Sequence, residues 1–367
     1  MYHHGRRIKT PVGFPFPTGI GGTIMATLKE LSERTGYSSA TISRILSGDP
    51  TLSVTEQTRR IVLEEAGRIN YIATRSKRGR MPRKSVRVAV AEMLTPVQQL
   101  DDPYFLYLSN SVRLGCLDRK YTFIPLEHRG DGFFADQTDN LTGIIAIGKF
   151  TPPQIDYLAS LSVNVVFVDS SPRESRFDSV VLGYELGISL ALEHLFNLGH
   201  RRIGYVGPYD DVLGLPEPRR QYFDQIMQKR GLWEPDLVLE CSMDAEATKK
   251  AFEQFWHSGT QIPTAFLCGN EENAIGTLAA LREAGLSVPD DVSVVSFNNT
   301  PKSALIEPAL TSVSAHVEEM GKVALRMLRE RAHVGGADPI RRIPMKVIVP
   351  PSITVRKSTG PVKNNCT

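Results

Sequence analysis

The amino-acid sequence predicts a small all-α head followed by a larger α/β body of two lobes. Amphipathic helical patterns run through residues 25–70. After residue 85, short apolar runs alternate with amphipathic segments, which is typical of parallel sheets with helices on both faces. The length of 367 residues is sufficient for one small head and a body of two lobes.

Residues 25–48 predict two short helices joined by a tight turn. Thr27 is a suitable N-cap for the first helix, and Glu30 three residues later fits a capping box. Gly36 suits the left-handed conformation that ends a helix, and Ser38 or the next serine can cap the second helix. The second helix gathers its apolar residues on one stripe, which comprises Ile42, Ile45 and Leu46.

The other faces of the second helix carry short side chains and one arginine. These residues are Ser39, Ala40, Ser43 and Arg44. Short side chains let a helix backbone approach the bases of DNA, and arginine can form a bidentate contact with guanine or pair with phosphate. The pattern is that of a helix-turn-helix whose second helix enters the major groove. An ordinary helical hairpin with an exposed arginine fits the same two helices.

Charge favours the DNA-binding interpretation of the head. Residues 53–70 predict a third helix, and residues 71–84 contain six basic residues and no acidic one. Residues 25–84 together hold twelve Lys and Arg against six Asp and Glu, so this part carries +6 while residues 85–367 carry −6. A basic segment is often only a solvated linker. Directly after a helix-turn-helix, it is well placed to contact phosphates or a groove.

Residues 25–80 resemble the DNA-binding head of the lactose-repressor/galactose-repressor family of bacterial transcription regulators. The resemblance lies in Ala26-Thr27-Leu28-Lys29-Glu30-Leu31, Gly36-Tyr37-Ser38-Ser39-Ala40-Thr41-Ile42-Ser43-Arg44-Ile45-Leu46 and Tyr71. It implies that Ser39, Ala40 and Arg44 face the bases. The DNA-binding residues expected in the head are Thr27, Ser38, Ser39, Ala40, Thr41, Ser43 and Arg44.

The linker departs from the family pattern. Relatives usually have a hinge helix there, with a Leu that enters the minor groove at the centre of the dimer. Here that position holds Arg80, with Gly79 before it and Pro82 after it, and both neighbours disfavour a helix. Met81 can act as the apolar wedge instead, or Arg80 can lie in a narrowed groove. A flexible linker without a wedge is the alternative.

Seven predicted strands and seven predicted helices make up the body. The strands are Val86–Ala91, Tyr121–Pro125, Gly143–Ile147, Val163–Val168, Ile203–Val206, Ala265–Cys268 and Val292–Phe297. The helices are Tyr104–Arg119, Pro153–Leu161, Leu186–Leu198, Arg219–Lys229, Ala245–His257, Glu272–Ala284 and Val317–Arg331. Ligands of such sheets bind beyond the carboxyl ends of the strands.

The body resembles that of the same family. The segments that carry the resemblance are Gly199–Gly207, Gly285–Phe297, Pro308–Val313 and Met320-Gly321. The resemblance implies a fold similar to periplasmic sugar-binding proteins: two Rossmann-like lobes joined by three crossovers, with an effector in the cleft. We expect the crossovers near Val181, Ser312 and Gly335.

These patterns divide the chain into five segments. Residues 1–24 are expected to be a disordered extension or a mis-assigned start, because the resemblance begins at Met25. Residues 25–70 form the head, 71–85 a basic hinge or linker, 86–355 the effector-binding and dimerisation domain, and 356–367 a tail. Lobe 1 is expected at about 86–181 and 313–335, and lobe 2 at about 182–312 and 336–355.

Six residues are expected to bind the effector. Tyr104, Lys149 and Asp169 follow or end strands, but they also fit a lobe core, a solvated lysine and a turn cap. Arg219 and Asn270 match the effector-binding Arg and amide of the family. Asn298 stands where most relatives have Asp, which leaves the identity of the sugar open.

The sequence favours a cytoplasmic homodimer that binds double-stranded operator DNA and a small carbohydrate, for which a galactoside is one candidate. Four scattered cysteines show neither metal-ligand spacing nor a disulfide framework, and no apolar run is long enough to span a membrane. We expect no cofactor, no metal and no catalytic residues, because no motif of an enzyme occurs. A sugar-responsive activator is the main alternative to a repressor. A transport-type sugar-binding protein would lack the head.

Overall fold

The computed structural model describes residues 27–46, 49, 52–69, 86–129, 132–134, 138–162, 164–334 and 337–363. The chain divides into two compact units, Met1–Pro82 and Arg83–Thr367, called here the head and the body. The predictions for residues 1–24, for the linker 71–85, and for Arg80 and Met81 within it lie outside the described residues.

The head contains three helices around a small apolar core. They are α1 (Leu28–Thr35), α2 (Ser39–Leu46) and α3 (Glu56–Arg68). Gly36 has φ of 76° and ends α1, as its position in the sequence predicts. The buried core residues are Leu31, Ile42, Ile45, Val62 and Ala66. Ile61, which precedes the buried Val62 on α3, is exposed.

The first lobe of the body is built on a sheet of seven described strands. In spatial order they are β12 (Lys346–Val349), β6 (Asp178–Leu182), β5 (Val165–Val168), β4 (Gly143–Ile147), β1 (Arg87–Glu92), β2 (Thr122–Arg129) and β3 (Gly132–Phe134). All neighbours are parallel except β2 and β3. The helices of this lobe are α4 (Gln98–Asp101), α5 (Pro103–Asp118), α6 (Pro152–Leu161) and α12 (Val317–Arg331).

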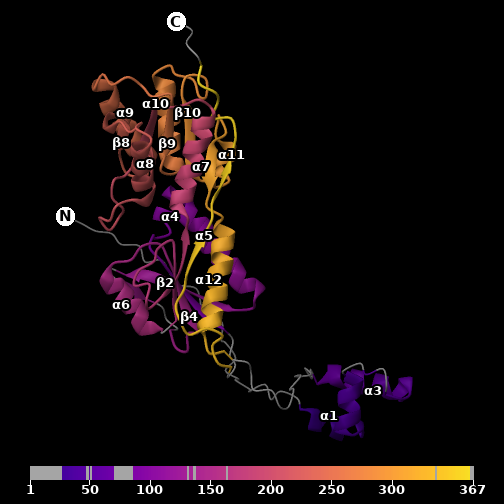
Figure 1. Ribbon diagram of the computed structural model, residues 1–367. Coiled ribbons are helices and arrows are strands. Elements are labelled where there is room, and N and C mark those ends of the chain that lie inside the picture. The colour runs from indigo at the N-terminus through magenta and orange to yellow at the C-terminus, as the bar shows by residue number, and fades with distance from the viewer. Residues whose placement is uncertain are drawn as a thin grey trace, which may run out of the picture. The chain divides into compact units, whose positions relative to one another are not determined.

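The second lobe is built on a sheet of six described strands. In spatial order they are β13 (Ser352–Thr354), β11 (Thr311–Ser314), β10 (Ser293–Asn298), β9 (Ala265–Cys268), β7 (Ile203–Gly207) and β8 (Val238–Glu240). Only β13 runs antiparallel to its neighbour. Its helices are α7 (Tyr184–Asn197), α8 (Pro218–Lys229), the short η1 (Pro235–Leu237), α9 (Ala245–His257), α10 (Glu271–Glu283) and α11 (Lys302–Leu305). Figure 1 shows α7 to α10 around this sheet, and α6 and α12 beside the first.

Three crossovers join the lobes, and one of them differs from the prediction. The chain leaves the first sheet after β6 and leaves the second after β11, close to the predicted Val181 and Ser312. The third was expected near Gly335. Instead, Lys346–Val349 pairs with β6 in the first sheet, so the crossing lies between Val349 and Ser352. The α/β fold class with two largely parallel sheets is therefore confirmed, and the boundary of the last segment is corrected.

Helix α12 packs closely against α5 within the first lobe. A Cβ at Gly321 would lie 2.1 Å from Ser111 Oγ, so a larger residue at this position would displace the Ser111 side chain. Leu325, one turn later on α12, lies against Gly115 of α5. None of the helices in the described ranges is both long and apolar enough to cross a membrane.

Candidate functional site

Helix α2 is held in place by a short set of local hydrogen bonds. Ser38 Oγ accepts a hydrogen bond from the backbone N–H of Thr41 at 3.1 Å, and the hydroxyls of Ser38 and Thr41 lie 2.9 Å apart. Thr27 Oγ1 accepts from the N–H of Glu30 at 3.2 Å and so caps α1. These bonds satisfy N–H groups at the starts of both helices. Ser38, Thr41 and Thr27 therefore have structural roles in addition to their predicted contacts with DNA.

One face of α2 is fully open. Ser39, Ala40, Ser43 and Arg44 are exposed, while Ile42 and Ile45 on the opposite face are buried. Arg44 Nε donates to Asp49 Oδ2 at 2.7 Å, which restrains the arginine side chain beside the helix. The predicted base-reading residues thus share one exposed surface. Small side chains and a restrained guanidinium suit the approach to a groove.

The body contains a cavity of about 990 Å³ that is lined by both lobes. Lobe 1 contributes segments that follow the carboxyl ends of β4 and β5, together with residues of β12. Lobe 2 contributes the start of α7 and the loop 211–218. Parallel sheets place ligands at this edge. Lys149 and Asp169 are the two predicted effector-binding residues among those that line the cavity.

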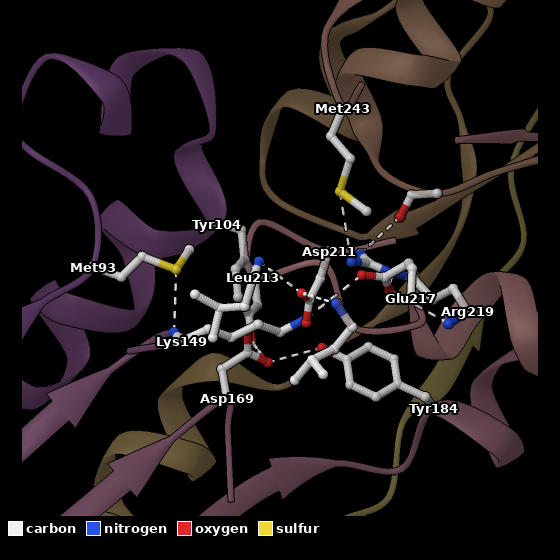
Figure 2. A network of polar contacts seen from close by, with 12 residues as sticks. Met93, Tyr104, Lys149, Asp169, Tyr184, Asp211, Leu213, Glu217, Arg219 and Met243 are labelled. Atoms are coloured by element: carbon white, nitrogen blue, oxygen red, sulfur yellow. Dashed lines mark hydrogen bonds and ion pairs between the residues drawn. The ribbon is translucent and has the colours of Figure 1, made fainter. Parts of the chain in front are cut away.

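Asp169 accepts hydrogen bonds from two tyrosines. The hydroxyl of Tyr104 lies 3.1 Å from Asp169 Oδ1, and the hydroxyl of Tyr184 lies 2.8 Å from the same oxygen (Figure 2). Tyr104 is buried behind the carboxylate. Burial raises the pKa of Asp169, although Lys149 and the two hydroxyls favour its charged form. Since Tyr184 belongs to α7, this carboxylate of the first lobe also binds the second.

Lys149 connects the lobes by charge. Its Nζ lies 2.8 Å from Asp211 Oδ2 and 3.6 Å from Glu217 Oε2 (Figure 2). Lys149 follows β4 in lobe 1, whereas both acids belong to the loop before α8 in lobe 2. Both carboxylates are nearly buried, so water solvates their negative charges only weakly. The ammonium group of Lys149 therefore compensates the cost of burying these charges.

Arg219, another predicted effector-binding residue, lies beside the cavity but is not among the residues that line it. Its Nε donates to Glu217 Oε1 at 2.7 Å and its Nη1 donates to the carbonyl oxygen of Gly269 at 2.9 Å. The guanidinium lies over the rings of Tyr184 and Phe297, at 5.4 and 5.6 Å from their centroids. Burial is the largest single influence and opposes its charge, but Glu217, Tyr184 and Tyr205 together outweigh burial and raise the pKa of Arg219. The guanidinium of Arg219 therefore binds groups of the protein itself, and it holds Tyr184, which lines the cavity, in place.

The two predicted asparagines do not line the cavity. Asn270 is buried and caps α10, because its Oδ1 accepts from the N–H of Asn273 at 2.8 Å and its Nδ2 donates to the carbonyl of Met243 at 3.2 Å. Asn298 ends β10 with φ of 88° and is half-buried. Asn270 follows β9 and Asn298 is the last residue of β10, but neither is among the residues that enclose the cavity.

Four residues of this polar network were not predicted as binding residues. They are Asp102, Tyr184, Asp211 and Glu217. Asp102 caps α5 by accepting from the N–H of Tyr104 at 3.3 Å, and burial raises its pKa to about 6 although Arg219 lowers it. The sequence contained one indication of each of the first two: Asp102 directly precedes α5, and Tyr184 is the first residue of α7. Asp211 and Glu217 lie in a loop whose partners are distant in sequence.

Comparisons with known proteins identify relatives of this chain. Residues 192–359 match the periplasmic binding protein-like domain family. The chain is 32% identical to the HTH-type transcriptional repressor MelR of Bacillus subtilis (strain 168), over 92% of this chain and 98% of that protein. It is 31% identical to the HTH-type transcriptional regulator GalR of Streptococcus thermophilus, over 91% and 100%. The crystal structure of the lac repressor dimer bound to operator and the anti-inducer ONPF has a similar fold, with a TM-score of 0.63 and 22% identity over 92% of this chain and 99% of that one.

Proposed function

Because the chain belongs to the lactose-repressor/galactose-repressor (LacI) family of transcription regulators, we propose that it represses carbohydrate-utilisation genes and is released from its operator by a small sugar. Helix α2 reads the operator through Ser39, Ala40 and Arg44. The sugar binds in the cavity between the lobes. The protein acts as a homodimer, since a head of this type reads one of two half-sites related by symmetry.

The cavity lined by both lobes is the observation that carries this proposal. A ligand there touches Lys149 and Asp169 of lobe 1 as well as Tyr184 and Asp211 of lobe 2. Their carboxylate, ammonium and hydroxyl groups are suitable partners for sugar hydroxyls. A ligand that inserts between Lys149 and Asp211 changes the contact that holds the lobes together. Such a ligand binds open and closed arrangements differently, which is the requirement for shifting an equilibrium.

The geometry gives little support to an enzyme. Glu271 and Glu272 are neighbours that resemble a catalytic pair in the sequence. In the structure, Glu271 accepts from the N–H of Thr300 at 2.6 Å and from the hydroxyl of Ser303, while Glu272 pairs with Lys302. The two carboxylates therefore serve different partners and do not converge on one reacting atom.

Fluorescence anisotropy on a palindromic operator, selected by the full chain from random DNA, tests the proposal. The operator-bound chain is titrated with a panel of mono- and disaccharides that includes galactosides, cellobiose and ribose. We expect at least one sugar to weaken operator binding, with no comparable effect on a non-operator duplex of equal length. If no sugar moves the isotherm, release by a carbohydrate is contradicted, and if no palindrome is enriched, the DNA-binding role fails.

A further inference from the structure

The arginine expected to read the operator has a long and exposed side chain. Arg44 lies in the last turn of α2, and 47% of its side chain is exposed. A bidentate contact with guanine requires the plane of the guanidinium to match the edge of the base. An arginine that samples several rotamers loses this freedom on binding, which weakens the contact. A neighbour that fixes the guanidinium beforehand therefore sharpens the reading of a base pair.

Asp49 is such a neighbour. Its Oδ2 accepts a hydrogen bond from Arg44 Nε at 2.7 Å, a distance typical of a charge-assisted bond. The side chain of Asp49 is 26% exposed, so it is less open to water than the arginine that it binds. Solvent therefore screens this pair less than a fully exposed one. Because the guanidinium is planar, a bond at Nε restrains the orientation of the whole group.

The backbone of Asp49 is itself attached to the head at two points. Its N–H donates to the carbonyl oxygen of Arg44 at 3.1 Å, and its own carbonyl accepts from the N–H of Leu52 at 3.4 Å. Leu52 packs against the buried core of the three helices. The Arg44 carbonyl is one of the last four of α2, which lack a partner within the helix, so the first bond also closes the helix end. Asp49 thus contacts Arg44 through both its main chain and its side chain.

Two electrostatic effects disfavour an acid at this position. The last carbonyl groups of a helix carry partial negative charge, so a carboxylate beside them is unfavourable. A carboxylate beside a surface that approaches DNA also repels the phosphates. The ion pair with Arg44 offsets these costs, and it gives the carboxylate a role in recognition.

We propose that Asp49 is a positioning residue for DNA recognition: it sets the orientation in which Arg44 reads a G·C base pair of each half-site, and so contributes to specificity without contacting DNA itself. This inference rests on the proposed function, because it specifies how the head recognises the operator. It assigns two opposite effects to one carboxylate. Asp49 strengthens binding to the operator and weakens binding to DNA of other sequence.

Fluorescence anisotropy with the full chain, the selected operator and a set of operator variants tests the inference. Each operator variant replaces a G·C pair by A·T in both half-sites. The pair that Arg44 reads is the one at which the native chain discriminates at least about tenfold and Arg44→Ala does not. We expect Asp49→Ala to reduce discrimination at this same pair to less than about threefold and to leave the other pairs unchanged. Its affinity for a non-operator duplex should stay the same or rise by up to about threefold, because a negative charge is removed.

The double variant Arg44→Ala/Asp49→Ala separates positioning from a purely structural role. We expect it to bind the operator no more weakly than Arg44→Ala alone, since Asp49 then has no guanidinium to position. Asp49→Asn keeps an oxygen that accepts from Nε but lacks the charge, so its discrimination should lie between those of the native chain and Asp49→Ala. Glu33→Ala is the control for removal of an exposed acid from the head, since Glu33 pairs with Lys29 on α1.

Thermal unfolding followed by circular dichroism checks that each variant is folded, and Asp49→Asn carries the test if Asp49→Ala is not. An equal loss of operator affinity from the Asp49 substitution in the native and Arg44→Ala backgrounds overturns the inference. So does a loss spread evenly over all base pairs, or a failure of Arg44→Ala to change discrimination at any pair. These results leave operator binding and its release by a sugar intact. If the native chain enriches no palindrome, the proposed function and the inference both fail.

Discussion

Arg44 in the head and Arg219 in the body are both predicted binding residues, yet their surroundings differ. The side chain of Arg44 is 47% exposed and pairs with Asp49, whereas that of Arg219 is 11% exposed and contacts Glu217, Gly269 and two aromatic rings. The head therefore places its predicted base-reading arginine outside its core. In the body, by contrast, predicted binding residues such as Arg219 and Asn270 make structural contacts around the cavity.

This difference predicts two kinds of response to substitution. In the head, a change at the DNA-reading face is expected to alter affinity with little effect on folding. In the body, a change in the polar network is expected to alter stability first, because buried ionic groups lose their partners. The following substitutions test the distinction.

The largest expected effect is that of Arg219→Ala. Among the described residues, it leaves the buried Glu217 with Lys149 as its remaining cationic partner, so the free energy of unfolding should fall by about 3–5 kcal/mol. Urea unfolding followed by tryptophan fluorescence measures this, since Trp233 and Trp256 are the two tryptophans of the chain and both lie in the body. The exposed Arg326 of α12 provides the control variant Arg326→Ala. Equal losses for both variants would show that Arg219 is not a supporting residue.

The next effect concerns pH. Burial raises the pKa of Asp102 to about 6 from the ordinary 3.8, so the folded state retains this proton where the unfolded state has released it. This contribution to stability is complete below about pH 4, declines as the pH rises towards 6 and is absent above it. Asp102→Asn keeps an acceptor for the N–H of Tyr104 and removes the titration.

The stability of the Asp102→Asn variant relative to the native chain should therefore increase by about 2 kcal/mol between pH 4 and pH 7. Thermal or urea unfolding at several pH values measures this difference directly. A difference that stays constant with pH would mean that Asp102 ionises normally in the folded chain.

The smallest expected effect on stability is that of Arg44→Ala in the head. Its exposed side chain adds little to folding, so unfolding should change by less than about 0.5 kcal/mol. Operator affinity should nevertheless fall by at least about 1 kcal/mol, because a base-reading contact is lost. Anisotropy with the selected operator measures the change, and Arg60→Ala on the exposed face of α3 is the control. An unaltered operator affinity would remove Arg44 from the reading face.

The sequence was most informative where structure is determined locally. Thr27, Gly36 and Ser38 are recognisable caps, and they determine the helices of the head with little help from the remainder of the chain. Helix α12 begins and ends at the predicted residues because its apolar residues recur regularly on one face. Such elements depend on neighbours within a few positions, which a single sequence contains.

Prediction was weakest where distant segments meet. Strand β12 was missed because Lys346–Val349 is a short edge strand in which Lys346 and Ile348 are exposed. It therefore lacks the longer buried apolar run by which the central strands were recognised. For the candidate site, the strand ends indicated Lys149 and Asp169, but the partners Asp211 and Tyr184 come from another lobe. Asn270 matched a family pattern, yet its amide is used to cap α10. Residue type alone does not distinguish a ligand contact from a cap.

Coupling between head and body is the central claim, and a reciprocal binding measurement tests it most directly. The affinity of the sugar that weakens operator binding most is measured by calorimetry for the free chain and for the chain saturated with its operator. We predict that the operator-bound chain binds this sugar at least fivefold more weakly, and that the sugar weakens operator binding by the same factor. Equal sugar affinity in the presence and absence of operator would contradict the account.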